Sequence, residues 1–166
     1  MKNKTKWILI VFILSFILSI IFSGISTAMA ESFNTIILAI TIIVVIGIGI
    51  VFDMIGVAVL TCKESNLHAK AAKKMKGAKA AIALIKNSTK VSSVCNDVIG
   101  DICGIVSGSL GAALTLDIVG AINISSVIVT MIVTATISAL TVGFKAIFKD
   151  IAEINSDAIV YTVGKI

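Results

Sequence analysis

Four long apolar stretches constrain the fold of this chain more than any other feature. They run from Trp7 to about Ser26, from Ile36 to about Leu60, from Val91 to about Leu116, and from Ser126 to about Phe144. A transmembrane helix needs about 20 predominantly apolar residues, whereas a strand of a membrane barrel is about half as long and alternates in polarity. Because these stretches are long and do not alternate, we predict an all-α, polytopic membrane protein with about four transmembrane helices.

The composition agrees with a membrane location and leaves little room for a soluble catalytic domain. Of the 166 residues, 58% are hydrophobic and only 14% are charged. Soluble domains are roughly half apolar and a quarter charged. A zinc protease of the HExxH type is excluded because His68 is the single histidine. A serine hydrolase would need a base within the membrane, which the sequence does not supply, so we expect no enzymatic activity.

Lysines mark one side of the membrane. The first apolar stretch follows the basic segment MKNKTK, and the last one is followed by Lys145 and Lys149. Basic residues accumulate on the cytoplasmic side, so we predict a multi-pass protein of the cell membrane with both termini in the cytoplasm. Residues 1–30 form either an N-terminal anchor or a signal peptide cleaved after Ala30. The apolar run exceeds that of a usual signal peptide, which favours the anchor.

A basic segment at about residues 62–90 separates the second and third apolar stretches. It carries eight of the chain's lysines but only one acidic residue, Glu64. We predict one amphipathic helix on the cytoplasmic surface, in contact with the bilayer and its anionic lipid headgroups. We expect no nucleic-acid partner, because aromatic residues do not interleave with the lysines. The apolar positions that recur at helical spacing are Leu67, Ala71, Met75, Ala78, Ile82 and Ile85.

Three carboxylates fall within the apolar stretches. Asp97 and Asp101 are four residues apart, so they share one face of the third predicted helix and repel unless one is protonated or a cation binds between them. Asp53 lies about two-thirds along the second helix. Either it lies in the membrane and needs a partner or a cation, or the helix ends near it and the carboxylate is hydrated at the interface.

Small and polar side chains also occur within these stretches. Gly100, Gly104 and Gly108 repeat at the four-residue spacing that permits close packing of membrane helices. We interpret the three cysteines as reduced packing residues, because no metal-ligand or CxxC spacing is present. A stripe of hydroxyl side chains on the fourth predicted helix either bonds back to its own backbone or forms a polar wall. Its members are Thr130, Thr134, Ser138 and Thr141.

Several segments in order resemble the transmembrane domain of the CNNM/CorB/CorC magnesium transporter family. They are FDMIGVAVLTCKES followed by the basic segment, then VSSVCNDVIGD, then LTVGFKAIFKDIAEINSDAIVYTVGK. The resemblance runs from about Val44 to the C terminus, and it implies that residues 31–166 form a CorB-like domain. In that family an FSG-type motif precedes the basic helix, an I-G-N motif follows, and the next span ends in F-G-E-x-x-P-K-x-x-A-x-x-N.

The resemblance implies a candidate magnesium site, with departures. Asn96 matches the asparagine of the I-G-N motif, which in the family helps to coordinate Mg²⁺. Asp53 takes the place of a family serine ligand, and Lys145 falls near an acidic position of the family. Ala152 and Asn155 match the end of the last motif. No part of this sequence matches the regulatory CBS domains of the family.

Two interpretations of this site follow from the sequence. In the first, Asp53, Asn96, Asp97 and Asp101 supply oxygen ligands to Mg²⁺ or a related divalent cation, and Ser107 and Thr141 line the site. In the second, the Lys145 ammonium turns inward and replaces the ion as an internal counter-ion. Lys145 can instead extend to the interface, which is the commonest arrangement for a lysine near the end of a span.

The sequence therefore yields two hypotheses for function. The leading one is a CorB-like membrane protein that binds and transports Mg²⁺ or a related cation, as a homodimer if the resemblance holds. The alternative is a non-transporting scaffold or partner-binding protein in which Lys145 has replaced the ion.

Overall fold

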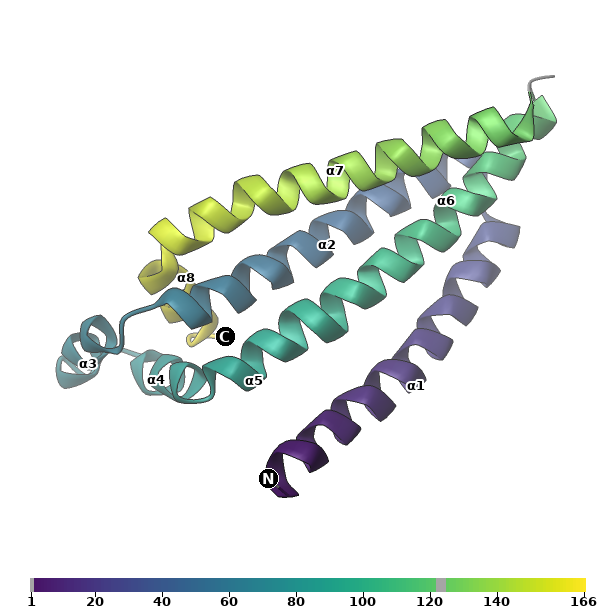
Figure 1. Ribbon diagram of the computed structural model, residues 1–166. Helices are drawn as coiled ribbons and strands as arrows, with labels where there is room; N and C mark the ends of the chain where they lie inside the picture. Colours follow the sequence, from purple (N-terminus) through teal and green to yellow (C-terminus); the bar gives the residue numbers. More distant parts are fainter. Residues whose placement is uncertain (1, 122–124) are drawn as a thin grey trace. The chain divides into compact units, whose positions relative to one another are not determined.

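The computed structural model of the chain describes residues 2–121 and 125–166, with side chains from Thr5 onward, and these residues form helices and short connections without strands. Three of the helices are long and uninterrupted: α1 (Lys2–Ser32), α2 (Thr35–Thr61) and α7 (Ser126–Ile154). A fourth long helical stretch consists of α5 (Ser88–Ser93), the π-helix η1 (Val94–Gly100) and α6 (Asp101–Ala121). The short helices are α3 (Glu64–Ala72), α4 (Ala78–Lys86) and α8 (Ser156–Val163) (Figure 1).

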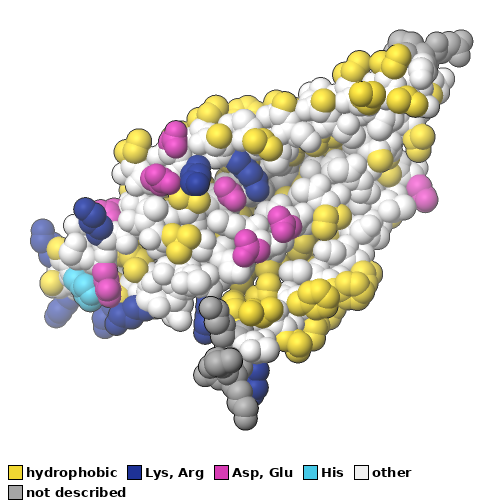
Figure 2. Space-filling view, viewed as in Figure 1, with side chains coloured by type: hydrophobic (Ala, Val, Ile, Leu, Met, Phe, Trp, Pro, Cys, Tyr) yellow, Lys and Arg dark blue, Asp and Glu magenta, His cyan; other side chains and the backbone are white. Residues whose placement is uncertain are grey.

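Four of these stretches are long and apolar enough to cross a membrane: Thr5–Ser32, Thr35–Thr61, Ser88–Ala121 and Ser126–Ile154. Large apolar side chains are exposed along them, such as Phe12 at 71% and Met131 at 65%. Figure 2 shows hydrophobic side chains at the surface along α1 and α7. Surfaces of this kind are stable in lipid, where exposed apolar side chains carry no hydration cost. The prediction of an all-α, multi-pass membrane protein is confirmed.

The boundaries of the elements differ from the prediction in three places. The basic segment at 62–90 forms α3 and α4 with a turn at residues 73–77, rather than one amphipathic helix. The predicted helix is interrupted at Gly77, because its φ angle of 85° lies in the left-handed region and is incompatible with a continuous α-helix. The last long helix continues to Ile154 instead of ending near Phe144. Residues 117–121, which follow the third predicted apolar stretch, belong to α6, and residues 122–124 lie outside the described part.

The chain divides into two compact units. Unit 1 comprises Met1–Gly49 and Asp101–Gly143, and unit 2 comprises Ile50–Gly100 and Phe144–Ile166. In unit 1, α1 packs along α6, and the Ser26 hydroxyl donates to Ser109 Oγ at 3.2 Å. The Thr35 hydroxyl at the start of α2 donates to the Asp117 carboxylate at 3.1 Å. These polar contacts join α1 and α2 to α6 through side chains that the apolar pattern does not reveal.

Unit 2 has an apolar core beneath the basic helices. Leu67, Ala81, Ala152 and Val160 are fully buried in it, and Ile82 and Ile85 pack against it. The predicted apolar face of the basic segment is therefore largely buried against protein rather than against lipid. Met75 is the exception, because it lies in the turn and remains 43% exposed.

Two glycines allow α8 to lie directly against α4. A Cβ atom on Gly77 would be 2.8 Å from the Gly164 carbonyl oxygen, and one on Gly164 would be 2.7 Å from the Gly77 oxygen. Real Cβ atoms do not approach backbone this closely. The end of the chain is thus held to the start of α4 by backbone contact that only glycine permits.

A hydrogen-bond cluster around Asp157 joins α8 to the end of α2. The Cys62 thiol donates to Asp157 Oδ1 at 3.1 Å, and the Asn66 amide donates to the other carboxylate oxygen. These bonds, first of all the one from Cys62, hold the pKa of Asp157 below its ordinary value. Burial, followed by the bond to Asp157, raises the pKa of the Cys62 thiol to about 12. The thiol is therefore protonated and unreactive at neutral pH.

We expect Cys62 in the folded protein to be alkylated by iodoacetamide at pH 8 on the order of 100-fold more slowly than in the denatured chain, because the thiolate is the reactive form. The rate should rise with pH until about 12. Asp157→Asn removes the neighbouring negative charge, so alkylation should become faster. Peptide-resolved mass spectrometry distinguishes Cys62 from Cys95 and Cys103.

The matched control is Asp150→Asn, because Asp150 is an exposed carboxylate of the same unit. It should leave the alkylation rate of Cys62 unchanged. Equal rates for the wild type and Asp157→Asn would contradict the role assigned to this carboxylate.

Candidate functional site

An ion pair between Asp53 and Lys145 is the most polar feature within the spans of unit 2. Lys145 Nζ lies 3.6 Å from Asp53 Oδ1, and the side chains are 30% and 18% exposed, respectively. Asp53 lies about 27 Å along α2 from Thr35, and Lys145 about 29 Å along α7 from Ser126. The hydrocarbon core is about 30 Å thick, so each residue is near its far boundary if the helices cross it steeply. Near that boundary a lone charge costs less than at the bilayer centre, and pairing reduces the cost further.

Lys145 Nζ lies close to Gly100. A Cβ atom at this position would be 3.6 Å from Lys145 Nζ, which is ordinary van der Waals contact. The same Cβ atom would lie 3.6 Å from the Cys95 carbonyl oxygen. The Lys145 ammonium therefore lies over the C-terminal end of η1, where Gly100 has no side chain to cover the backbone.

The π-helix η1 is the second unusual feature of this site. It covers Val94–Gly100 and interrupts an otherwise α-helical span. A π-helix has i→i+5 hydrogen bonds, is rare, and occurs frequently at functional sites. It contains Asn96 and Asp97, which are two of the four predicted metal ligands. It could not be predicted, because no residue pattern in VCNDVIG distinguishes a π-helix from an α-helix.

The Asn96 side chain lies directly against Gly56 of α2. A Cβ atom on Gly56 would overlap Asn96 Oδ1. The Asn96 amide nitrogen is 3.5 Å from Ser92 Oγ, whereas its Oδ1 atom is buried and has no hydrogen-bond partner. A buried acceptor without a hydrogen-bond partner lowers the stability of the fold by about 1–3 kcal/mol. We therefore expect this atom to have a function that offsets the loss. Sequence reasoning missed Gly56, although a glycine one turn from Asp53 was visible.

The other predicted acidic ligands do not share this ion pair. Asp97 is exposed and accepts a hydrogen bond from the Ser93 hydroxyl at 2.8 Å. Asp101 is also exposed and begins α6, in unit 1. Among the described residues, no group of three His, Cys, Asp or Glu side chains is arranged to hold a metal ion.

The donor set at Asp53 does not fit a divalent cation in this arrangement. Mg²⁺ takes octahedral oxygen ligands and is bound by one or two carboxylates together with waters. Here the single carboxylate faces an ammonium, whose positive charge would repel the ion. A divalent cation at Asp53 therefore requires Lys145 to withdraw or to lose its proton.

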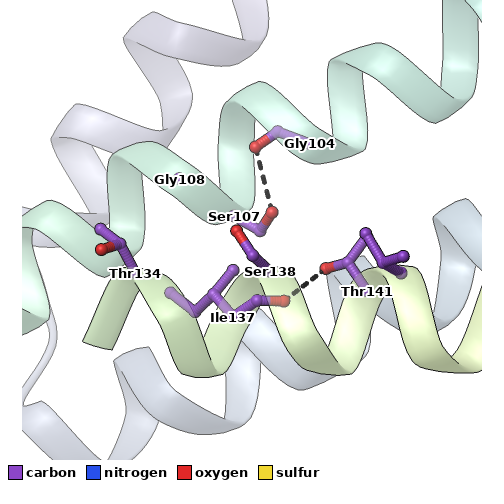
Figure 3. Close-up of a pocket in the computed structure, with 8 residues that line it drawn as sticks. Gly104, Ser107, Gly108, Thr134, Ile137, Ser138 and Thr141 are labelled. Atoms are coloured by element: carbon purple, nitrogen blue, oxygen red, sulfur yellow. Dashed lines mark hydrogen bonds between the residues drawn. The ribbon is translucent and has the colours of Figure 1, made fainter. Parts of the chain in front are cut away.

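The predicted lining residues Ser107 and Thr141 lie together in unit 1, on the wall of a cavity of about 260 Å³ between α6 and α7. Figure 3 shows Ser107 and Ser138 pointing toward one another across it. Ser107 donates to the Gly104 carbonyl at 3.1 Å, and Thr141 donates to the Ile137 carbonyl at 2.8 Å. The hydroxyls of Ser107 and Thr141 thus bond back to their own helices and also contribute oxygen atoms to the wall of the cavity.

Comparisons of the chain with known protein families, with curated proteins and with solved structures found no match. The class therefore follows from the fold alone. This chain is a multi-pass α-helical membrane protein, and within unit 2 it has an Asp–Lys ion pair beside a π-helix.

Replacing Gly56 by alanine tests the packing of Asn96. We expect Gly56→Ala to lower the thermal unfolding midpoint in detergent micelles, because the new Cβ atom overlaps the Asn96 amide. Displacing well-packed side chains costs about 1–3 kcal/mol. The matched control is Gly47→Ala on the same helix, where nothing lies within 4 Å of the new atom. This control should be neutral or slightly stabilising, since alanine is the better helix former.

The double variant Gly56→Ala/Asn96→Ala completes the test. If the two side chains compete for one space, the second substitution should recover part of the midpoint lost in the first. Additive losses would mean that Asn96 does not lie against Gly56.

Proposed function

We propose that this protein is a divergent, non-transporting member of the CNNM/CorB/CorC type, acting as a membrane scaffold or partner-binding subunit without enzymatic activity. The observation that carries the proposal is the distance of 3.6 Å between Lys145 Nζ and Asp53 Oδ1. In this proposal the tethered ammonium occupies the place that a cation takes in the family. A permanent internal counter-ion keeps the carboxylate neutralised without any bound ion.

An ammonium tethered to the chain is a more favourable partner for the Asp53 carboxylate than a free cation. An ammonium attached to the same chain needs no ion from solution, whereas Mg²⁺ must shed tightly held water to reach Asp53. A divalent ion would in addition have to displace the ammonium from its carboxylate. For an ion pair shielded from water this separation is costly, because it leaves a charge without a partner.

A second candidate function is binding and transport of Mg²⁺ or a related divalent cation. The observation that favours it is the buried Asn96 Oδ1 atom, which has no hydrogen-bond partner and is an oxygen ligand of the type Mg²⁺ accepts. This function requires a second state in which Lys145 leaves Asp53. Asp97 would then supply a further carboxylate.

The topology and partners belong to the same proposal. Unit 1 contains equal numbers of lysines and acidic residues, so the whole net charge of +5 falls in unit 2. Basic residues accumulate on the cytoplasmic side, which supports a cytoplasmic position for the basic helices and the C terminus. Lys2, Lys4 and Lys6 support the same position for the N terminus in the cell membrane. The partners that we propose are anionic lipid headgroups and, by resemblance to the family, a second copy of the chain.

Lys145→Met tests whether the ammonium replaces a cation. We expect a lower thermal unfolding midpoint, with a loss between the roughly 1 kcal/mol of an exposed pair and the roughly 3–5 kcal/mol of a buried one. Asp53→Asn/Lys145→Met should recover much of the loss, because no charge then lacks a partner. Millimolar MgCl₂ should leave the wild type unchanged and stabilise Lys145→Met, where the carboxylate has become available.

Lys149→Met is the matched control, because Lys149 is an exposed lysine one turn further along α7. NaCl of equal ionic strength controls for screening. Saturable stabilisation of the wild type by Mg²⁺ would instead support the second candidate. Mg²⁺ flux into proteoliposomes that Asp97→Asn abolishes would overturn the non-transporting proposal.

A further inference from the structure

A lysine-lined cavity lies at the turn between α3 and α4. Its volume is about 370 Å³, and its walls are formed by Ala71, Lys74, Met75, Lys76, Gly77 and Lys79. All three lysine side chains are exposed. In Figure 2 the basic side chains gather at this end of unit 2, close to His68, the single cyan side chain.

The backbone of the turn adds to the positive potential of the cavity. Gly77 precedes α4 without a side-chain cap, and Lys79 belongs to the first helical turn. The first backbone N–H groups of a helix have no intrahelical acceptor and favour an anion. The segment that contains the turn keeps a net positive charge, because residues 62–90 carry eight lysines and one acidic residue, Glu64.

Two further lysines are held beside this turn. Lys70 Nζ lies 4.4 Å and Lys165 Nζ 4.6 Å from the centroid of the Tyr161 ring. The Lys165 stem also passes over Gly77, since a Cβ atom there would be 2.8 Å from Lys165 Cγ. Cation–π contacts fix these ammonium groups beside the ring. Lys70 also acts on the Asp157 carboxylate, whose pKa it helps to lower, whereas Lys165 adds positive charge beside the turn.

We propose that this cavity binds the phosphate of an anionic phospholipid headgroup, through Lys74, Lys76 and Lys79. Two observations favour a lipid over a free phosphate ion. Met75 is 43% exposed in the wall of the cavity, which suits contact with the glycerol and acyl boundary. In addition, only residues 62 and 63 separate the membrane span α2 from α3, and α3 is about 14 Å long. The turn is thus within reach of the bilayer surface.

This site differs from the diffuse attraction expected of a basic amphipathic helix. The apolar face of α3 and α4 is occupied by the core of unit 2, with Leu67, Ala78 and Ala81 fully buried. These helices therefore do not insert an apolar face into lipid. Contact with the membrane is concentrated at the turn. The inference rests on the proposed lipid partner but not on the pairing of Asp53 with Lys145.

The test compares two triple variants with the same change in charge. Lys74→Gln/Lys76→Gln/Lys79→Gln removes the lysines of the cavity. Lys63→Gln/Lys86→Gln/Lys149→Gln removes three exposed lysines of the same unit that do not line it. The full-length protein is purified in a neutral detergent, and binding of short-chain phosphatidylglycerol, phosphatidylcholine and inorganic phosphate is measured by native mass spectrometry and titration. Circular dichroism verifies that each variant is folded.

We expect the wild type and the control variant to bind phosphatidylglycerol in preference to phosphatidylcholine. The cavity variant should bind it on the order of 100-fold more weakly, because each lysine near anionic lipid contributes about fivefold. Equal weakening in both triple variants would show diffuse attraction and overturn the proposal. Equal binding of the two lipids would also overturn it, and so would displacement of phosphatidylglycerol by inorganic phosphate at similar concentration.

Discussion

The bilayer's lack of hydrogen-bonding groups is the constraint on which the rest of this structure depends. A peptide group in hydrocarbon must be bonded within its own segment, so each apolar stretch becomes a helix. The same constraint acts on side chains. Thr134 and Thr141 bond to carbonyls of their own helix, and the Asp53 carboxylate is paired with an ammonium. Among the described buried side-chain nitrogen and oxygen atoms, Asn96 Oδ1 alone has no hydrogen-bond partner.

The fold class could be predicted from the sequence because hydropathy reports it directly. The ends of elements were less predictable, since they depend on tertiary contacts. The helix α7 continues past Phe144 because Ala152 is buried in the core of unit 2. The basic segment divides into α3 and α4 because Gly77 adopts a positive φ angle against Gly164, a contact between residues far apart in sequence.

The candidate site was only partly accessible from the sequence. The spacing of Asp97 and Asp101 suggested a shared ligand set, but spacing along one helix says nothing of which side chains meet across helices. Asp97 bonds to Ser93 on its own helical stretch, while Asp53 meets Lys145 from α7. The second interpretation of the sequence included Lys145 as a counter-ion, and the proposed function builds on that interpretation. The π-helix could not be predicted from the sequence, because it depends on one additional residue in a helical turn rather than on a residue type.

That additional residue has a consequence for how the span can vary. A π-helix holds one residue more than an α-helix needs over the same rise, so deleting one residue within Val94–Gly100 would return the segment to regular α-helical geometry. The helices on either side would keep their lengths and their register with the membrane. Elsewhere in the span, a one-residue deletion would rotate every following side chain by about 100° around the helix axis. Variation in chain length is therefore tolerated best at the segment that carries Asn96, where it would also change the environment of the ion pair.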